Sequence, residues 1–330
     1  MEYIMEQSRD IQKLVQIAKM YYIEGMTQES IAKIIGISRS TVSQLITEAK
    51  NAGLVQITIK DPAANNQELA SEFEKRFGLR KCIVVPTTLK KHDMLLKIVV
   101  SQMVRVMLDV IKSHSSFGMA WGTACYEFMQ AFPDDTDFCD ITVVPLIGGS
   151  SLAMQEFQIN ECVRQFAEKV NGNPLFMYSP GIVESLDDKM HFLESVYMKG
   201  ILEQWKQLDS AVIGIGRPVE SFEGGPFALD NQLSRVRKNP EGHVGDFCAR
   251  YFNIRGEFMN CSHNDRLIGI DGDCLRNVKN VAAIAVGETK VFPIIGALNS
   301  GILHYFATDE HTAKQVLDLL DSGALDDIIK

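Results

Sequence analysis

The stretch TQESIAKIIGISRSTVSQLITEAKNAG, residues 27–53, decides the fold of the first part of the chain. Thr27 stands where a helix N-cap is expected, and the residues after it place apolar side chains at helical spacing. Gly36 then allows a tight turn, and Ser38 is the expected N-cap of a second helix. That helix ends near Gly53, and its inner face is formed by Val42, Leu45, Ile46 and Ala49. The pattern predicts two short helices joined by a glycine turn, which is the arrangement of a helix-turn-helix.

Two further elements complete this unit. Apolar residues recur at spacings of three and four between 11 and 22, which predicts an amphipathic helix that ends near Gly25. Residues 54–60, LVQITIK, alternate in polarity and are rich in β-branched side chains, so we expect a strand that forms a wing. The next six residues, DPAANN, have the composition of a linker. We therefore predict a winged helix-turn-helix domain at residues 1–60 and a second domain at residues 61–330.

The second helix of the pair begins with polar and basic side chains that suit the reading of DNA. A helix-turn-helix places this helix in the major groove and reads bases from its first turns. Arginine can bond guanine and glutamine can bond adenine, while free N–H groups at the start of the preceding helix can hold a phosphate. The predicted DNA-binding residues are Thr27, Gln28, Arg39, Ser40, Thr41, Ser43, Gln44 and Lys50. The alternative is a helical hairpin that serves only dimerisation or packing.

The net charge of the whole chain is unfavourable for binding nucleic acid, but its two parts differ when it is divided at the linker. The 330 residues hold 33 Lys and Arg against 42 Asp and Glu, a formal net charge of −9. Residues 1–60 hold seven basic and six acidic side chains, so the first domain carries +1 and the second −10. Because affinity for DNA rises with the number of cations presented, a nearly neutral domain implies that several copies act together. We expect a homo-oligomer, a dimer or tetramer, on double-stranded operator DNA.

Composition excludes several other classes of protein. Hydrophobic residues make up 46% and charged residues 23% of the chain, which is ordinary for a globular protein with a buried core. No apolar run reaches the roughly 18 residues of a membrane helix, and the polar start predicts no secretory signal. We therefore expect no membrane partner and a cytoplasmic location. The seven cysteines are scattered and match no zinc spacing, so we expect free thiols, no metal and no cofactor.

After the linker, short apolar runs alternate with helical stretches. This alternation predicts a Rossmann-like α/β domain with a mostly parallel sheet and helices on both faces. The expected strands are 82–85, 117–120, 141–146, 211–215, 281–286 and 302–305. The expected helices are 66–77, 91–112, 123–132, 156–170, 187–207, 288–298 and 309–320. In such folds, ligands bind beyond the carboxyl ends of the strands.

Three loops at the ends of expected elements carry candidate ligand-binding residues. Gly122 and Thr123 lie between a strand and a helix, where free N–H groups and the helix dipole suit a phosphate; a plain tight turn is the alternative. Lys290 lies in the first turn of another helix, where a cation is unfavourable unless an anion is present, although it could be a solvated lysine. Asp246 follows a glycine-rich turn and could either bind sugar hydroxyls or cap the turn.

Together these motifs resemble the SorC family of bacterial transcription regulators. The resemblance rests on residues 27–46 and on Gly122-Thr123-Ala124, 143–149, Val244-Gly245-Asp246, Gly287-x-x-Lys290, 297–301 and 308–313. It implies an effector domain similar in fold to glucosamine-6-phosphate deaminase and ribose-5-phosphate isomerase, which binds a phosphorylated sugar.

The same resemblance implies roles for individual residues. The residues expected to hold the phosphate are Gly122, Thr123, Ala124 and Lys290, with Gly287 in the same motif, and those expected at the sugar are Gly149, Asn160 and Asp246. Ala124 and Val286 stand where many members have a hydroxyl residue and a glycine. These departures weaken the expected phosphate site and leave the sugar open.

The predicted function is that of a DNA-binding regulator of a sugar-catabolic operon, controlled by a phosphorylated sugar. One alternative is a sugar-phosphate isomerase or deaminase on the same fold, in which Asp246 would act as the base and His243 would assist it. Another is an interaction module that binds no ligand. The DNA-reading domain and the family resemblance favour the regulator over both.

Overall fold

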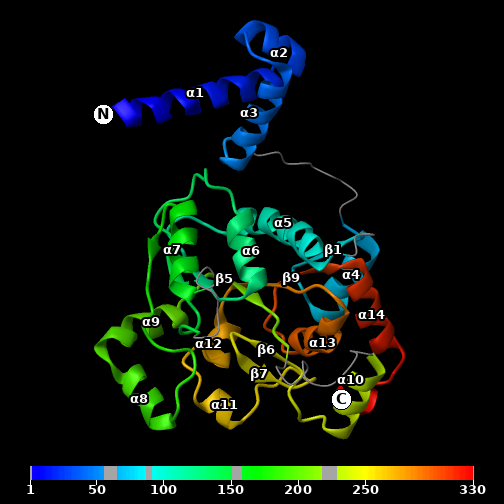
Figure 1. Ribbon diagram of the computed structural model, residues 1–330. Coiled ribbons are helices and arrows are strands. Elements are labelled where there is room, and N and C mark those ends of the chain that lie inside the picture. The colour runs from blue at the N-terminus through cyan, green and yellow to red at the C-terminus, as the bar shows by residue number, and fades with distance from the viewer. Residues whose placement is uncertain (1, 56–64, 87–90, 151–157, 218–228, 330) are drawn as a thin grey trace. The chain divides into compact units, whose positions relative to one another are not determined.

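The computed structural model describes residues 2–55, 65–86, 91–150, 158–217 and 229–329. The chain divides into two compact units, Met1–Pro62 and Ala63–Lys330, each described here by itself (Figure 1). The expected wing strand at 54–60 lies outside the described residues except for Leu54 and Val55, neither of which is in a strand. In the described part of the chain, no helix is long and apolar enough to cross a bilayer.

The first unit consists of helices α1 (Glu2–Tyr22), α2 (Gln28–Ile35) and α3 (Arg39–Asn51). The helices form where their patterns predict them, and Gly36 ends α2 in the left-handed conformation (φ 76°). Their inner faces meet in a small core made of Leu14, Ile17, Ala18, Ile31, Ala32, Val42, Ile46 and Ala49. Partly buried side chains such as Ile35 and Leu45 pack against this core. Because the core is small, each of its members contributes a large share of the stability of the unit.

The second unit is built around one seven-stranded sheet with the order β1-β9-β8-β5-β2-β3-β4. Every neighbouring pair in this sheet is parallel. The strands are β1 (Lys81–Val85), β2 (Ser116–Met119), β3 (Thr142–Pro145), β4 (Asn173–Pro174), β5 (Ser210–Gly214), β8 (Asn280–Ile284) and β9 (Tyr305–Asp309). The chain leaves β2 toward β3 and leaves β5 toward β8, so the order reverses between the adjacent strands β2 and β5. Reversals of this kind open a crevice at the carboxyl ends of the strands.

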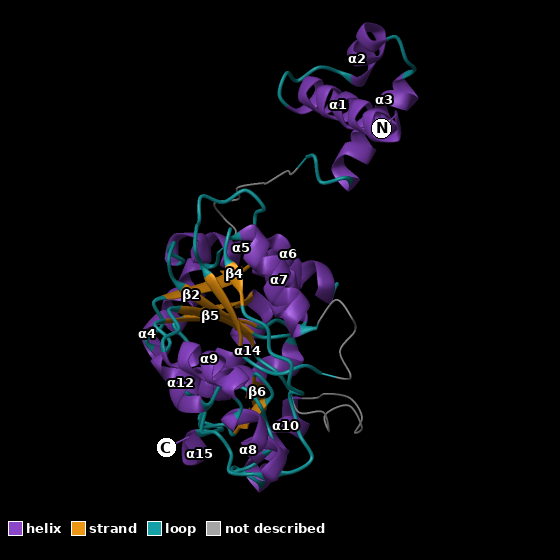
Figure 2. Ribbon diagram, turned by 90° about the vertical axis from the view of Figure 1, so that its left-hand side faces the viewer, coloured by secondary structure: helices purple, strands orange, loops and turns teal. Residues whose placement is uncertain are grey.

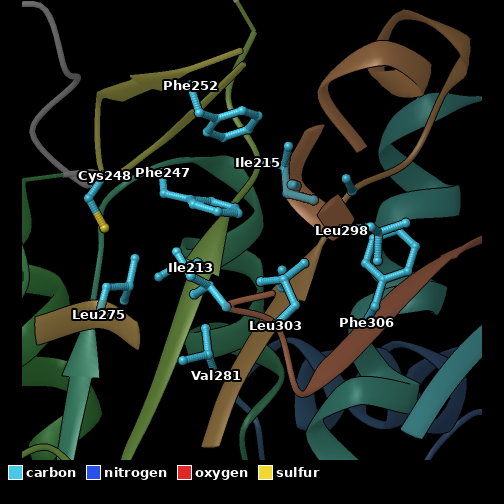
Figure 3. Packing of buried hydrophobic residues seen from close by; sticks show 14 of the residues in the cluster. Ile213, Ile215, Phe247, Cys248, Phe252, Leu275, Val281, Leu298, Leu303 and Phe306 are labelled. Carbon is cyan, nitrogen blue, oxygen red and sulfur yellow. The ribbon is translucent and has the colours of Figure 1, made fainter. Parts of the chain in front are cut away.

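Helices cover both faces of the sheet (Figure 2). One face packs against α5 (His92–Val110), α6 (Thr123–Ala131) and α7 (Ile159–Lys169). The other packs against α4 (Gln67–Phe77), α9 (Val196–Lys206), α12 (Gly272–Asn277), α13 (Val291–Asn299) and α14 (Glu310–Asp321). Figure 3 shows the second face, where Ile213 and Val281 from the sheet lie among Phe247, Leu303 and Phe306. The alternation of side chains along each strand supplies both cores, which is why the strands read as continuous apolar runs.

Several elements differ from the sequence-based expectation. The last strand is Tyr305–Asp309 and not 302–305, because its buried end carries the polar pair Thr308 and Asp309. The helix expected at 187–207 is two helices, α8 (Leu186–Glu194) and α9, since Ser195 is extended and caps α9 with its hydroxyl. The helix expected at 288–298 begins with a 3₁₀ turn, η3 (Glu288–Lys290), before α13.

Some elements were missed because their patterns are short or polar. These are α10 (Leu229–Lys238), α11 (Ser262–Asp265), α15 (Asp326–Ile329), α12, β4 and the antiparallel hairpin β6 (Gly245–Phe247) with β7 (Arg250–Phe252). The hairpin is the one that matters for function, because it supplies a wall of the site described below.

Candidate functional site

The first candidate site is the surface formed by the start of α3 and the start of α2. Arg39, Ser43 and Gln44 are exposed on α3, and Thr27, Gln28 and Arg39 line one open hollow together with Tyr21 and Tyr22. The structure thus brings the beginnings of both helices together, as a DNA-reading surface requires. Lys50 is also exposed, but it lies in the last turn of α3, where its ammonium is 6.0 Å from the centre of the Tyr22 ring.

Side chains within this surface close the ends of their own helices. Thr27 Oγ1 accepts a hydrogen bond from the N–H of Ser30 (3.2 Å), and Ser38 Oγ accepts one from the N–H of Thr41 (3.1 Å). The hydroxyls of Ser40 and Thr41 each lie 2.7 Å from Ser38 Oγ. The capping predicted for Thr27 and Ser38 is confirmed. Arg39, Ser40, Ser43 and Gln44 are the exposed residues in the first two turns of α3, and of these Ser40 has its hydroxyl against Ser38.

The second candidate site is a cavity of about 690 Å³ in the second unit. Its walls come from the segments that follow β2, β3, β5 and β8, so it lies at the carboxyl ends of the strands, where the strand order reverses. A cavity of this size suits a small organic ligand. Among the predicted effector-binding residues, those that line it are Gly122, Thr123, Ala124, Gly149, Asp246 and Lys290.

The start of α6 forms one end of the cavity. Gly122 is the N-cap residue at φ 125°, a backbone conformation that side chains rarely permit, and it offers no side chain to cap the helix. Thr123 is exposed at the first helical position. The N–H groups of the first turn of a helix have no partner within the helix, so this end of the cavity is suited to an anion.

Lys290 and Asp246 face the same cavity, and burial changes the chemistry of both. Burial lowers the pKa of Lys290 to about 8, an effect that Asp246 opposes and Arg217 reinforces. Burial raises the pKa of Asp246 to about 6, against the influence of Lys290 and of the N–H of Ala249. The ammonium of Lys290 donates to the carbonyl oxygen of Ile215 at 2.6 Å, which fixes its position. The cavity therefore holds a cation and a carboxylate whose charged forms both lack full solvation.

The position of Asp246 is fixed by the hairpin and by a glycine. Its Oδ1 accepts a hydrogen bond from the N–H of Ala249 at 2.9 Å. Cys248 and Ala249, at φ 50° and 61°, form the two-residue turn between β6 and β7, as in a type I′ turn built without glycine. A Cβ added to Gly216 would lie 1.7 Å from Asp246 Oδ2, so the carboxylate rests directly on the backbone after β5. The carboxylate is thus held from both sides before any ligand binds.

Two of the predicted effector-binding residues are not brought into the wall of the cavity. The amide of Asn160 is bonded to the backbone of Met177, with its Oδ1 accepting at 2.9 Å and its Nδ2 donating at 3.1 Å. The N–H of Gly287 donates to Thr312 Oγ1 (2.8 Å) and to Asp309 Oδ2 (3.1 Å). These bonds hold the loops that carry other site residues, so both positions support the cavity from behind.

Other lining residues had no signal in the sequence. Trp121, Tyr251 and His263 line the cavity, as do His92 and Arg217. The Tyr251 ring stacks on His263 with centroids 3.9 Å apart, and on its other side on His243 at 4.6 Å. Only the glycine-rich turn at 242–246 pointed to this hairpin, because the residues of the stack come from three separate segments of chain.

Comparison with known proteins agrees with this arrangement. Residues 61–318 match the family described as "Putative sugar-binding domain", and residues 15–51 match "Sigma-70, region 4". The chain is 26% identical to the sorbitol operon regulator of Klebsiella pneumoniae, over 95% of this chain and all of that protein. It is 28% identical to the deoxyribonucleoside regulator of Bacillus subtilis, over 94% of this chain and 99% of that protein.

A solved structure supports the same assignment. The full-length sorbitol operon regulator SorC from Klebsiella pneumoniae superimposes with a TM-score of 0.71 at 25% identity, covering 93% of this chain and 99% of that one. These relatives are named as transcription regulators, and they give no support to the alternative of an isomerase or deaminase. With a helix-turn-helix, a matching sugar-binding domain and relatives aligned over nearly its whole length, the chain belongs to the SorC family of transcription regulators.

Proposed function

We propose that this regulator binds operator DNA through residues 1–60 and a phosphorylated sugar through the cavity of the second unit. The phosphate lies at the start of α6 against Gly122, Thr123 and Ala124, with Lys290 as its counter-ion. The sugar extends toward Gly149 and Asp246. No cofactor takes part, and the protein acts in the cytoplasm, where its DNA lies.

The observation that carries this proposal is the state of Lys290. Its pKa is lowered to about 8 by burial, although it lies in the cavity that also holds the open N-terminus of α6. A cation at this place is stabilised when an anion joins it, because the anion replaces the lost solvation of the ammonium. An anion with one or two charges would stabilise the ammonium of Lys290. The carboxylate of Asp246 in the same cavity can accept hydrogen bonds from hydroxyl groups, which favours a ligand with both a phosphate and a sugar.

On the DNA side, we propose that Arg39, Ser43 and Gln44 read base edges in the major groove. Thr27, Gln28, Ser40 and Thr41 contact the phosphates beside them, and Lys50 contacts the backbone farther along. The exposure of the first three residues supports this division, since the hydroxyls of Ser40 and Thr41 already lie against Ser38.

We also propose that two or more copies assemble. Of the large apolar side chains exposed in the described ranges, seven lie between 178 and 197: Tyr178, Ile182, Leu186, Met190, Phe192, Val196 and Tyr197. No residue of α8 is buried, although three of these side chains belong to it. Ile182 also lines the cavity, so a second copy seated on this surface would sense the ligand.

A pair of substitutions tests the proposal by separating its two halves. We expect Arg39→Ala to weaken operator binding by roughly 1–3 kcal/mol, the loss of one good contact, while the response to sugar phosphates is kept. We expect Lys290→Ala to keep operator binding and to lose both the thermal shift and the operator release caused by a panel of hexose and pentose phosphates. Normal operator affinity in the first variant, or a normal response in the second, would contradict the corresponding half.

The assembly is tested by light scattering. We expect Val196→Glu, at the most exposed side chain of the apolar surface (84%), to reduce the mass of the particle, whereas Lys199→Glu on the same helix leaves it unchanged. An unchanged mass in the Val196 variant would exclude this surface as the contact.

A further inference from the structure

We infer that His114, Cys139 and Asp140 form a binding site for Zn²⁺ or a chemically similar divalent cation. All three side chains are exposed, and one donor atom can be taken from each so that the three atoms lie within 4.8 Å of one another. Imidazole nitrogen, thiolate sulfur and carboxylate oxygen are the three kinds of ligand that zinc takes in proteins. The spacing of these residues in sequence follows no zinc motif, because two separate loops supply them.

Two pairs of side chains lie at distances close to those between zinc ligands, although the two pairs use different nitrogens of the imidazole. His114 Nε2 lies 3.7 Å from Cys139 Sγ, and His114 Nδ1 lies 3.2 Å from Asp140 Oδ2. Tetrahedral zinc with ordinary bond lengths separates its ligand atoms by roughly 3.3–3.6 Å. One zinc ion can bind only one of these two nitrogens, so the exposed imidazole must rotate to bring that nitrogen to both the thiolate and the carboxylate. A water molecule would complete the four ligands, as it does in zinc sites with three protein ligands.

The backbone holds the three residues in place without help from a metal. His114 and Asp140 both have left-handed backbones, at φ 57° and 53°. The N–H of His114 donates to the carbonyl oxygen of Cys139 at 2.9 Å, and the N–H of Cys139 donates to Ser113 Oγ at 3.2 Å. The N–H of Asp140 donates to the carbonyl oxygen of Asn171 at 3.2 Å. These bonds join the loop before β3 to the loops before β2 and β4. The backbones of the three residues are therefore fixed, and the imidazole of His114 is the side chain that has to rotate when the metal binds.

Cys139 differs from the other cysteines in a way that suits a ligand. All seven cysteines lie in the described ranges; four are buried, two are half-buried, and Cys139 alone is exposed. A buried thiol cannot reach a metal in solution, whereas Cys139 stands beside two other donors at the surface.

This site is separate from the effector cavity. His114 and Asp140 precede β2 and β3, while the cavity is lined by residues that follow these strands, at their carboxyl ends. Four residues of strand span roughly 13 Å, so the cation and the effector occupy opposite ends of the same two strands. Loss of one site therefore leaves the other in place, and the two proposals can fail independently.

The experiment is a titration of the metal-free full-length protein with Zn²⁺ against a chromophoric competitor. We expect one equivalent to bind per chain and to protect Cys139 from alkylation, as read by mass spectrometry. Cys139→Ser, His114→Asn and Asp140→Asn should each weaken binding at least about tenfold. Asparagine is chosen at the two left-handed positions because it tolerates that conformation. With Co²⁺ as the probe, the thiolate charge-transfer band should appear in the parent protein and vanish in Cys139→Ser.

Three controls of the same residue types lie elsewhere on the surface. His191→Asn, Cys274→Ser and Asp273→Asn should leave binding unchanged, since none of these residues belongs to the cluster. The proposal is overturned if the parent protein binds no Zn²⁺, if Cys139→Ser binds it as tightly as the parent, or if alkylation of Cys139 proceeds at the same rate with and without the metal.

Discussion

The helix starts at the two candidate sites are capped differently. In the first unit, the DNA-reading unit (residues 1–62), Thr27 caps α2 and Ser38 caps α3 with their own side chains. In the second, the sensing unit (residues 63–330), side chains likewise cap α4, α8, α9, α12 and α14. Helix α6 differs, because it begins at Gly122 in the wall of the cavity and has no side chain to cap it. The start of α6 therefore leaves backbone donors for a ligand, whereas the helix starts of the reading surface close themselves.

This difference has consequences for how each unit works. The reading surface consists of exposed and half-buried groups that lie close together in sequence. The sensing cavity gathers groups from distant segments and buries them, which shifts the pKa of Lys290 and of Asp246 toward neutrality. The reading unit would therefore recognise DNA through side chains at its surface. The sensing unit would recognise its ligand through buried charged groups that lack full solvation.

The largest effect should come from Val42→Asp in the core of the reading unit. Val42 is fully buried among few other side chains, so an unpaired carboxylate there should cost more than about 4 kcal/mol and unfold this unit. We expect titration calorimetry to show that operator binding is lost. We expect scanning calorimetry to show that the thermal transition of the sensing unit persists. Thr47→Asp, exposed on the same helix and not among the proposed DNA contacts, is the control. Loss of both transitions would show that the two units do not fold separately.

A glycine substitution should then affect only the sensing unit. In Gly216→Ala the new Cβ would meet the carboxylate of Asp246, so the hairpin must shift, at a cost of about 1–3 kcal/mol in the free energy of unfolding. At Gly214 an added Cβ meets no atom within 4 Å, and Gly214→Ala should leave stability nearly unchanged. Denaturant unfolding of both variants measures the difference. Equal stability would mean that Asp246 is not held by the backbone after β5.

The dependence of effector affinity on pH sharpens the comparison further. The folded-state pKa of Lys290 is lowered to about 8, so its ammonium is lost as the pH rises through that value. If the charged form alone holds the phosphate, affinity for a sugar phosphate should fall about tenfold between pH 7 and pH 9. Isothermal titration across this range measures the fall, and Lys290→Met should abolish the dependence. Below pH 6 the carboxylate of Asp246 takes up a proton, and contacts that need it ionised should weaken.

The smallest effect should come from the cap of α3. Ser38→Ala removes the acceptor of the Thr41 N–H, which should destabilise the reading unit by about 1 kcal/mol. Ser38→Asp keeps an acceptor and should restore most of the stability. Thermal denaturation followed by circular dichroism measures both. If the alanine variant is as stable as the parent, water and not Ser38 satisfies the N-terminus of α3, and the reading surface and the start of α6 do not differ in this respect.

The sequence predicts the reading unit better than the sensing unit, because the first depends on local contacts and the second on contacts between distant segments. In the reading unit, helix bounds and caps depend on neighbours three or four residues away, and Thr27 and Ser38 cap as predicted. In the sensing unit, the pattern predicts most strands but places the last one too early, because buried Thr308 and Asp309 end it. The sequence could not predict that Trp121, Tyr251 and His263 line one cavity, because these residues come from separate segments that only the folded chain brings together.

The pairing of β1 with β9 has a consequence for the synthesis of the protein. Lys81 lies beside Tyr305, so the first strand of the sensing sheet finds its neighbour only after nearly the whole chain has been made. The core of α1, α2 and α3 involves only the first 55 residues and can form while the ribosome is still translating the rest. A newly made chain can therefore hold a folded DNA-reading unit before its sensing sheet is complete. Because the nearly neutral reading unit is expected to act in several copies, such a chain becomes a regulator only after its sensing sheet has formed and copies have assembled.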